Sequence, residues 1–275
     1  MAVGLVALVA LVVVTLLGAG PSAAVPALAL VLAAAAWAHL RSDAAVLAVS
    51  HAVPADPATH PRLHNLVDGL CTAAGLPKPR LYVIDDPAPN ALATGRDPGR
   101  ASVAVTTGLL ERLDRVQLEG VLAHELSHVK SHDILVSTLA VTVVGGATLV
   151  ADLAERAQRW GGTRHRDEVA PGGGGPVAAL LGAAGSLLRL LTPVVAHAMQ
   201  VALPGERDAR ADMAAVSLTR YPPGLVAALE KLRTDGTAVH SAVQATAHLW
   251  IAPPLAPDRP PGGRPPLGER IDALR

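Results

Sequence analysis

The chain of 275 residues has one cysteine, no phenylalanine and an aromatic content of only 2%. A single cysteine, Cys71, excludes a scaffold held by internal disulfides. The shortage of aromatic rings leaves little to stack on nucleic-acid bases. Because 23 basic residues balance 23 acidic ones, the net basic charge typical of a nucleic-acid-binding protein is missing as well. We therefore expect no nucleic-acid partner.

Charge is also scarce, whereas apolar residues are abundant. Charged residues make up 17% of the chain and hydrophobic residues 51%, against roughly 25% charged in soluble globular proteins. Residues 2–17 and 23–38 carry no charge and approach the roughly 17–25 residues that span a bilayer. We predict that they form a transmembrane hairpin over 1–40. A secretory signal peptide is the alternative, but the first run has no basic start and a second apolar run follows at once.

A second pair of apolar runs occurs in the middle of the chain. Residues 134–150 contain no charge, whereas residues 177–203 include Arg189, which would have to face protein, a water-filled cavity or the membrane interface. We predict a second transmembrane hairpin over 134–203 with a polar loop at 151–176. The alternative for its second half is a helix that is only partly buried in lipid.

Basic residues near the ends of these runs predict the orientation. Arg41, Lys130 and Arg207 place the segments 41–133 and 204–275 in the cytoplasm under the positive-inside rule. The chain is therefore expected to be a multi-pass membrane protein, with the lipid bilayer as a partner.

The first cytoplasmic segment has the pattern of a small α+β unit. Apolar spacing predicts a helix over 60–74 that stops at Gly75. Residues 81–84 and 101–106 read as strands. The stretch 252–268, rich in proline and glycine, is expected to be an irregular loop.

A further helix carries the chemistry. It is expected to begin at Asp114, whose side chain can form a capping box with Gln117. His124 and His128 follow, four residues apart on one helix face, so both imidazoles can bind one Zn²⁺ ion. Glu125 would stand beside the open coordination position and act as the base that takes a proton from water activated by zinc.

A catalytic zinc needs a third protein ligand. Asp208 and Asp212 share a helix face by the same spacing, and the intervening hairpin would return them to the side of the membrane that carries His124. Taken alone, this segment also fits a solvated, charged helix next to the membrane.

Several motifs occur in one order that resembles the HtpX-type membrane zinc endopeptidases, which are relatives of the prenyl-protein CAAX endopeptidases. The similarity covers most of residues 60–275. Its motifs are Asn90–Gly95, Thr106–Leu110, Leu122–His128 with Asp133 beyond, Arg207–Asp212 and Pro265–Ile271.

The resemblance implies a mainly α protein with a small β element, in which a zincin-like metalloprotease domain is interrupted by and attached to transmembrane helices. It implies one Zn²⁺ per chain and hydrolysis of peptide bonds in membrane or misfolded proteins. It also places Asn90 on the segment that binds the substrate backbone. Two alternatives stay open: a sensor protease that cuts one regulator, and a catalytically silent membrane scaffold.

The chain departs from the family pattern at two positions. Asp208 stands where the family has glutamate as the third zinc ligand, so either Asp208 binds the metal or Glu206 replaces it. Asp212 would then orient a ligand histidine. Arg264 stands where the family usually has histidine, while Arg270 is retained. Either arginine could stabilise the oxyanion of the tetrahedral intermediate, and Arg270 is our choice.

Overall fold

The structure is a computed structural model that describes residues 43–135, 138, 206–243, 246–254 and 265–275. These residues all belong to one unit, in which 42–141 and 197–275 come together. None of the helices within them is both long and apolar enough to cross a bilayer. The predicted hairpin over 1–40 lies outside the described residues, as does the second hairpin over 134–203 apart from its first few residues.

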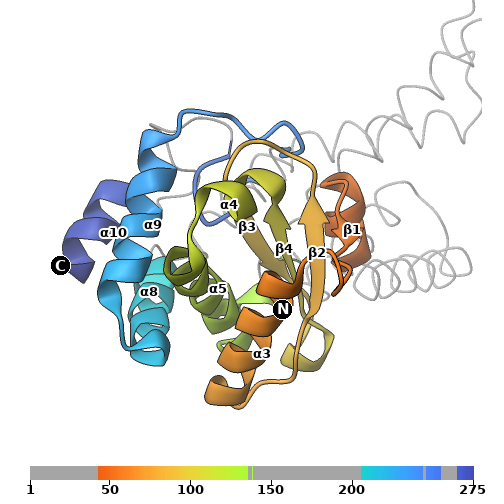
Figure 1. The fold of residues 1–275 in the computed structure, drawn as a ribbon, viewed down its shortest axis with the longest axis horizontal. Helices are drawn as coiled ribbons and strands as arrows, with labels where there is room; N and C mark the ends of the chain where they lie inside the picture. Colours follow the sequence, from red (N-terminus) through yellow and green to blue (C-terminus); the bar gives the residue numbers. More distant parts are fainter. Residues whose placement is uncertain (1–42, 136–137, 139–205, 244–245, 255–264) are drawn as a thin grey trace, which may run out of the picture. The chain divides into compact units, whose positions relative to one another are not determined.

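A small mixed sheet forms one side of the unit (Figure 1). Its order is β1-β2-β4-β3, in which β2 runs parallel to β4 while β1 and β3 are antiparallel to their neighbours. Every residue of β3 and β4 is buried. The two predicted strands are confirmed as β2 and β4, whereas the short β1 and β3 were not predicted. The bounds are β1 Val53–Pro54, β2 Arg80–Ile84, β3 Ala91–Thr94 and β4 Ser102–Thr106.

The helix predicted over 60–74 from its apolar spacing is confirmed as α3 (Pro61–Ala74). Its buried side chains are Leu63, Leu66, Val67, Leu70 and Cys71. Gly75 ends the helix in the left-handed conformation, with a φ of 66°, and its backbone N–H bonds the last turn. A residue without a Cβ adopts this conformation at little cost, which is why glycine is common there.

The helix α5 (Arg115–Lys130) begins with the predicted capping box. Asp114 Oδ1 accepts hydrogen bonds from the backbone N–H groups of Val116 and Gln117, and Gln117 Oε1 accepts one from the N–H of Asp114. The helix contacts β3 and α3 as well as helices from the C-terminal part of the chain. Because it is surrounded by other elements, apolar residues occur on several of its faces.

The described residues after 205 form the helices α8, α9 and α10, which lie to the left of α5 in Figure 1. The helices α8 and α9 pack directly on α5. At this contact, a Cβ on Gly120 of α5 would stand 2.8 Å from the backbone nitrogen of Leu225, so only glycine fits. The bounds are α8 Glu206–Thr219, α9 Pro222–Thr234 and α10 Leu267–Leu274. Two short elements, α4 (Thr107–Arg112) and the 3-10 helix η1 (Pro98–Arg100), precede α5 in the sequence.

The described part of the chain is therefore mainly helical with a small sheet, as the family resemblance implied. The prediction of an irregular loop over 252–268 is wrong for its last two residues, because α10 begins at Leu267. Burial of Leu267 and Ile271 against the core stabilises this helix.

Candidate metal centre

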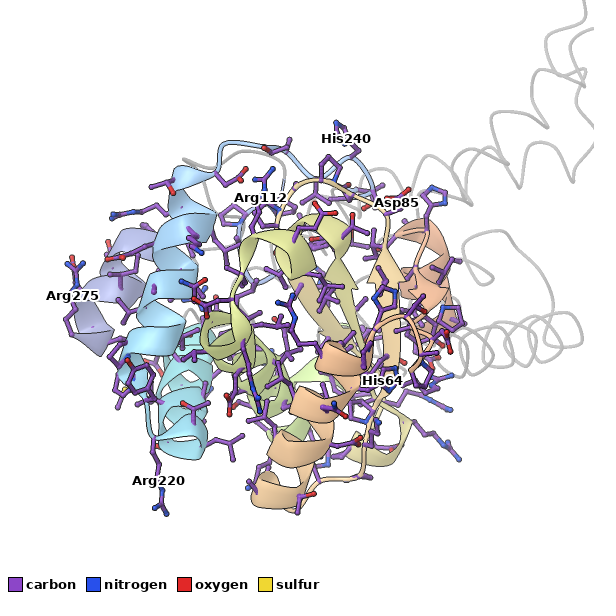
Figure 2. All side chains as sticks on the ribbon, in the orientation of Figure 1. His64, Asp85, Arg112, Arg220, His240 and Arg275 are labelled. Carbon is purple, nitrogen blue, oxygen red and sulfur yellow. The ribbon has the colours of Figure 1, made fainter. Side chains whose placement is uncertain are left out.

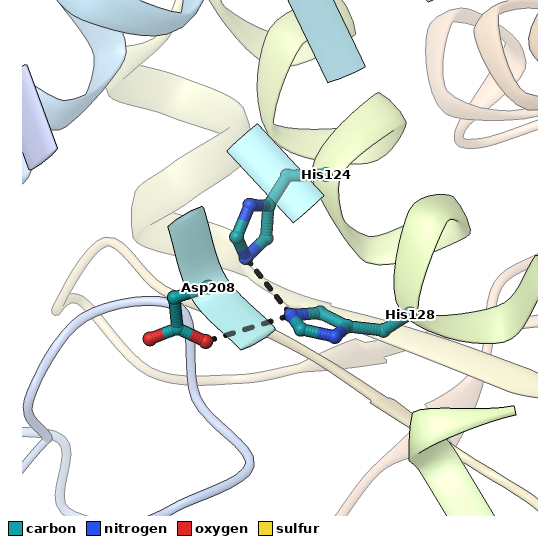
Figure 3. A group of neighbouring side chains, drawn as sticks. All are labelled: His124, His128 and Asp208. Carbon is teal, nitrogen blue, oxygen red and sulfur yellow. Dashed lines mark hydrogen bonds and ion pairs between the residues drawn. The ribbon is translucent and has the colours of Figure 1, made fainter. Parts of the chain in front are cut away.

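Three side chains from two distant segments converge on one point (Figure 3). His124 and His128 lie one turn apart on α5, and their Nε2 atoms are 3.2 Å apart. Asp208, in the first turn of α8, places Oδ1 3.7 Å from Nε2 of His128. One ligand atom from each residue lies within 4.8 Å of the other two.

This group has the chemistry and the spacing that a zinc ion requires. Tetrahedral ligands about 2.0–2.2 Å from a common ion are separated from one another by roughly 3.3–3.6 Å. The His124–His128 and His128–Asp208 separations, 3.2 and 3.7 Å, lie at the two ends of that range, and all three ligand atoms lie within 4.8 Å of one another. Two imidazole nitrogens and one carboxylate oxygen form a donor set found in catalytic zinc sites. The residues therefore fit the metal.

Behind the first histidine lies a buried chain of polar contacts from His124 through Asp212 to Arg270. His124 Nδ1 is 2.7 Å from Asp212 Oδ1, and the side chains of both residues are at most 3% exposed. Arg270 of α10 donates to both carboxylate oxygens of Asp212, from Nε at 2.8 Å and from a terminal nitrogen at 2.7 Å. The carboxylate is thus held from two sides.

The environment keeps His124 neutral and Asp212 ionised. Burial lowers the pKa of His124 to about 4, although Asp212 opposes this shift. Burial alone would raise the pKa of Asp212, but the charge that His124 gains when it is protonated in acid, together with the hydrogen bonds and charge of Arg270, outweighs burial and lowers the value to about 2. A neutral imidazole that donates its Nδ1–H to Asp212 leaves the lone pair of Nε2 directed at the metal position.

Glu125 is buried beside this group, with 1% of its surface exposed. It follows His124 directly on α5, and its charge, like that of Asp208, contributes to the raised pKa of Arg270. Burial by itself would lower that pKa, so the acidic groups around the guanidinium outweigh desolvation. A carboxylate therefore lies in the same buried, charged environment as the three converging side chains.

Of the two acidic residues considered as third ligand, only one joins the histidines. Asp208 is 6% exposed and belongs to the group described above. Glu206, at the first position of α8, is exposed, and it is not part of any metal-binding group found among the described residues.

The guanidinium of Arg270 was expected to face an oxyanion. The structure directs it to other partners: besides Asp212, it donates from the other terminal nitrogen to the backbone carbonyl of Ile251 at 2.9 Å. Arg270 thereby links α10 to α8 and to the segment before α10. The alternative arginine, Arg264, lies outside the described residues.

Asn90, expected to bind the substrate backbone, is 2% exposed and bonds the chain itself. Its side-chain nitrogen donates to the carbonyl of Ala252, and its side-chain oxygen accepts from the N–H of Ala252. The same segment pairs with β3, since the N–H of Ile251 bonds the carbonyl of Ala91 and Trp250 forms a bridge with Leu92. The sequence contained no signal for this contact.

Three further side chains of types that can react or bind a metal lie outside this group. Cys71 is buried, and burial raises the pKa of its thiol, which makes it a poor nucleophile. His240 points outward (Figure 2), with 77% of its side chain exposed. His64, also labelled there, places Nε2 3.0 Å from the carbonyl of Ala55.

Comparisons with known proteins agree with this chemistry. Residues 57–275 match the description "Peptidase family M48". A "Protease HtpX homolog" of Caldanaerobacter subterraneus subsp. tengcongensis is 39% identical over 241 residues, which are 86% of this chain and 79% of that protein. A "Protease HtpX homolog" of Tropheryma whipplei is 41% identical over 224 residues, which are 78% and 72% of the two chains.

Among solved structures, that of S. mikatae Ste24p is similar, with a TM-score of 0.47 and 19% sequence identity. The similarity covers 81% of this chain and 51% of that chain.

Proposed function

The chain belongs to peptidase family M48 and is a metalloprotease, and we propose that its metal is zinc, one ion per chain, held by His124, His128 and Asp208. The observation that carries this proposal is the convergence of the three ligand atoms within 4.8 Å, although Asp208 follows the histidines only after a long excursion of the chain. With two imidazole nitrogens and one carboxylate oxygen as its protein ligands, the ion would still be able to bind substrate or water.

The residues around the metal position divide the work of peptide hydrolysis. Zinc, when bound, supplies Lewis-acid polarisation of a carbonyl and a lowered pKa for water. Glu125 takes a proton from the attacking water at its carboxylate and returns it to the departing amine. Burial of Glu125 excludes bulk water from this exchange, which favours transfer between the carboxylate and the reacting atoms.

Asp212 and Arg270 act from behind His124. Asp212 accepts the Nδ1–H of His124 and so selects the tautomer and the ring orientation. Arg270 holds Asp212 by two hydrogen bonds and balances its buried charge. We therefore assign Arg270 the role of positioning Asp212. The N–H groups of Arg270 that bond Asp212 and Ile251 are not free to bind an oxyanion as well.

For the whole chain we propose two transmembrane hairpins, over 1–40 and 134–203, with the polar loop 151–176 on the far side. The catalytic parts, 41–133 and 204–275, would face the cytoplasm of an inner-membrane protein. The supporting observation is the distribution of apolar runs and flanking basic residues. Protein or peptide substrates drawn from membrane or misfolded proteins suit an active site held next to a bilayer.

Neither alternative is favoured. A silent scaffold gives no reason for a buried glutamate beside two histidines and a second carboxylate, whereas a bound metal ion would offset the cost of burying these charges. A sensor protease would share the same site and differ only in substrate range. The relatives reported above carry the name of a protease without that restriction.

The test is zinc stoichiometry of the purified full-length protein, measured by mass spectrometry of metals for the wild type, Asp208→Ala and Glu206→Ala. We expect one zinc per chain in the wild type and Glu206→Ala, and loss of zinc in Asp208→Ala. Loss in Glu206→Ala instead would move the third ligand to Glu206, and a wild type without zinc would overturn the proposal.

A further inference from the structure

The second histidine of the pair has an acidic partner of its own. His128 Nδ1 lies 3.5 Å from Asp133 Oδ2, on the side of the ring opposite the Nε2 that faces Asp208. Asp133 follows the end of α5 by three residues. Between them, His132 adopts a positive φ of 59°, and Ser131 donates to Asp133 Oδ2 at 2.6 Å.

Asp133 in turn contacts a residue that returns from the far end of the intervening segment. Arg207 Nε lies 3.8 Å from Asp133 Oδ1, and the side chains of Arg207 and Asp133 are 17% and 20% exposed. Arg207 directly precedes Asp208 on α8. Each histidine therefore contacts an aspartate that in turn contacts an arginine. The chain of contacts His124–Asp212–Arg270 lies deep in the core. The chain His128–Asp133–Arg207 lies nearer the surface.

The two contacting residues flank the segment between α5 and α8. Closing a long excursion of the chain costs conformational entropy, and a contact between its two ends helps to hold them at a fixed separation. Because Asp208 is one methylene shorter than glutamate, the first turn of α8 has to lie close to the end of α5 if its carboxylate is to reach the metal position.

We propose that Asp133 and Arg207 are positioning residues for the metal centre: Asp133 orients His128 through Nδ1, and the Asp133–Arg207 ion pair fixes the first turn of α8, and with it Asp208, against the end of α5. We call this pair the Asp133–Arg207 clasp. This inference rests on the proposed function, since it assumes that His128 and Asp208 bind one ion. It assigns a role to two residues outside the ligand set.

The clasp predicts a specific pattern of metal affinity. Removing a carboxylate behind a ligand histidine typically weakens metal binding by about 10–100-fold. Asp133→Asn keeps the size of the side chain and removes its charge, so we expect a loss in that range. Arg207→Gln removes the cation and is expected to weaken binding less, because His128 keeps its carboxylate, while Arg207→Lys retains the charge and restores part of the affinity.

The experiment measures zinc affinity of the purified full-length protein by competition with a chromogenic chelator, together with the visible absorption spectrum of the cobalt-substituted protein, which reports ligand geometry. Asp43→Asn is the matched control, because Asp43 also forms an ion pair with an arginine, Arg80, and is 12% exposed. We expect its zinc affinity and cobalt spectrum to equal those of the wild type. Thermal unfolding of each metal-free variant verifies that the fold is retained.

Weaker zinc binding and a changed cobalt spectrum in Asp133→Asn, with the control unchanged, would support the clasp. If Asp133→Asn binds zinc as tightly as the wild type and gives the same cobalt spectrum, the clasp is overturned and the proposed function stays intact. A wild type that binds no zinc would instead remove the proposed function itself. If Asp133→Asn does not fold, Arg207→Gln and Arg207→Lys carry the test, and equal affinity in these two variants and the wild type would overturn the clasp.

Discussion

His124 and Asp212 form a buried pair in which the imidazole Nδ1 lies 2.7 Å from a carboxylate oxygen. The pair joins α5 to α8, two helices that are remote in sequence. It also determines which nitrogen of His124 is free to bind a metal, since the other carries the hydrogen bond. The geometry of the candidate metal centre therefore depends on a residue that does not touch the metal position.

The first prediction concerns Asp212→Asn. This change removes the charge that balances buried Arg270, and breaking a buried pair typically costs about 3–5 kcal/mol. We expect a midpoint of thermal unfolding lowered by several degrees and zinc affinity weakened by roughly 10–100-fold. Asp272→Asn, at an exposed position of α10, serves as the control, and equal stability in the two variants would contradict the prediction.

The second prediction concerns Glu125→Gln. An amide cannot take a proton from water, so we expect peptide cleavage to fall by about 10²–10⁴-fold while zinc content stays at the wild-type level. Cleavage of an unfolded casein and metal analysis of the same sample measure the two quantities. Glu119→Gln, on the same helix, is the control and should cleave normally. Wild-type cleavage by Glu125→Gln would show that another residue is the base.

The third prediction concerns acid stability of the metal-free protein. His124 has a pKa of about 4 in the folded chain and an ordinary value near 6.5 when unfolded. Its imidazole therefore binds a proton more readily in the unfolded chain, so acid favours unfolding. The stability that neutral His124 contributes is fully present above about pH 6.5 and is lost as the pH falls towards 4, on the order of 3 kcal/mol in total.

Asp212 adds to this loss only at lower pH, because its folded pKa of about 2 lies below the ordinary value of 3.8. Thermal unfolding of chelator-treated full-length protein between pH 7 and pH 4 provides the measurement. His240→Gln, at an exposed position, should leave the profile unchanged, whereas His124→Gln should flatten it. A wild-type midpoint that does not fall over this range would contradict the assignment of a neutral, buried His124.

The fourth prediction separates two roles of Asn90. In the structure its amide bonds both backbone groups of Ala252, so Asn90→Ala leaves them unpaired at about 1–3 kcal/mol each. We expect a lower unfolding midpoint, with Asn65→Ala on the exposed face of α3 as the control. A raised KM without any loss of stability would instead indicate that Asn90 binds substrate, as the family resemblance implies.

Local features were predictable from sequence because they depend on neighbours within a few residues. The capping box of Asp114 and Gln117 and the left-handed stop at Gly75 are examples. The short strands β1 and β3 were missed because two and four residues carry little alternating pattern. The start of α10 was missed because the preceding prolines dominated the local signal, whereas burial of Leu267 decides it.

Residue spacing in the sequence did not predict which side chains and backbone groups Asn90, Arg270 and Asp133 contact. Each of these side chains meets a partner whose position depends on how separate elements pack. Ala252 reaches Asn90 because its segment pairs with β3. Arg270 reaches Asp212 because α10 and α8 contact each other.

By itself the sequence determined that His124 and His128 share one helix face, because the pitch of an α-helix places residues four apart one turn above the other. It also determined that Asp208 and Asp212 do the same on a second helix. Only the tertiary structure decided that these two faces meet, that Asp208 and not Glu206 joins the histidines, and that Arg270 bonds Asp212. The reason is physical: spacing along a helix is set by local backbone geometry, whereas the distance between two helices is set by the packing of everything around them.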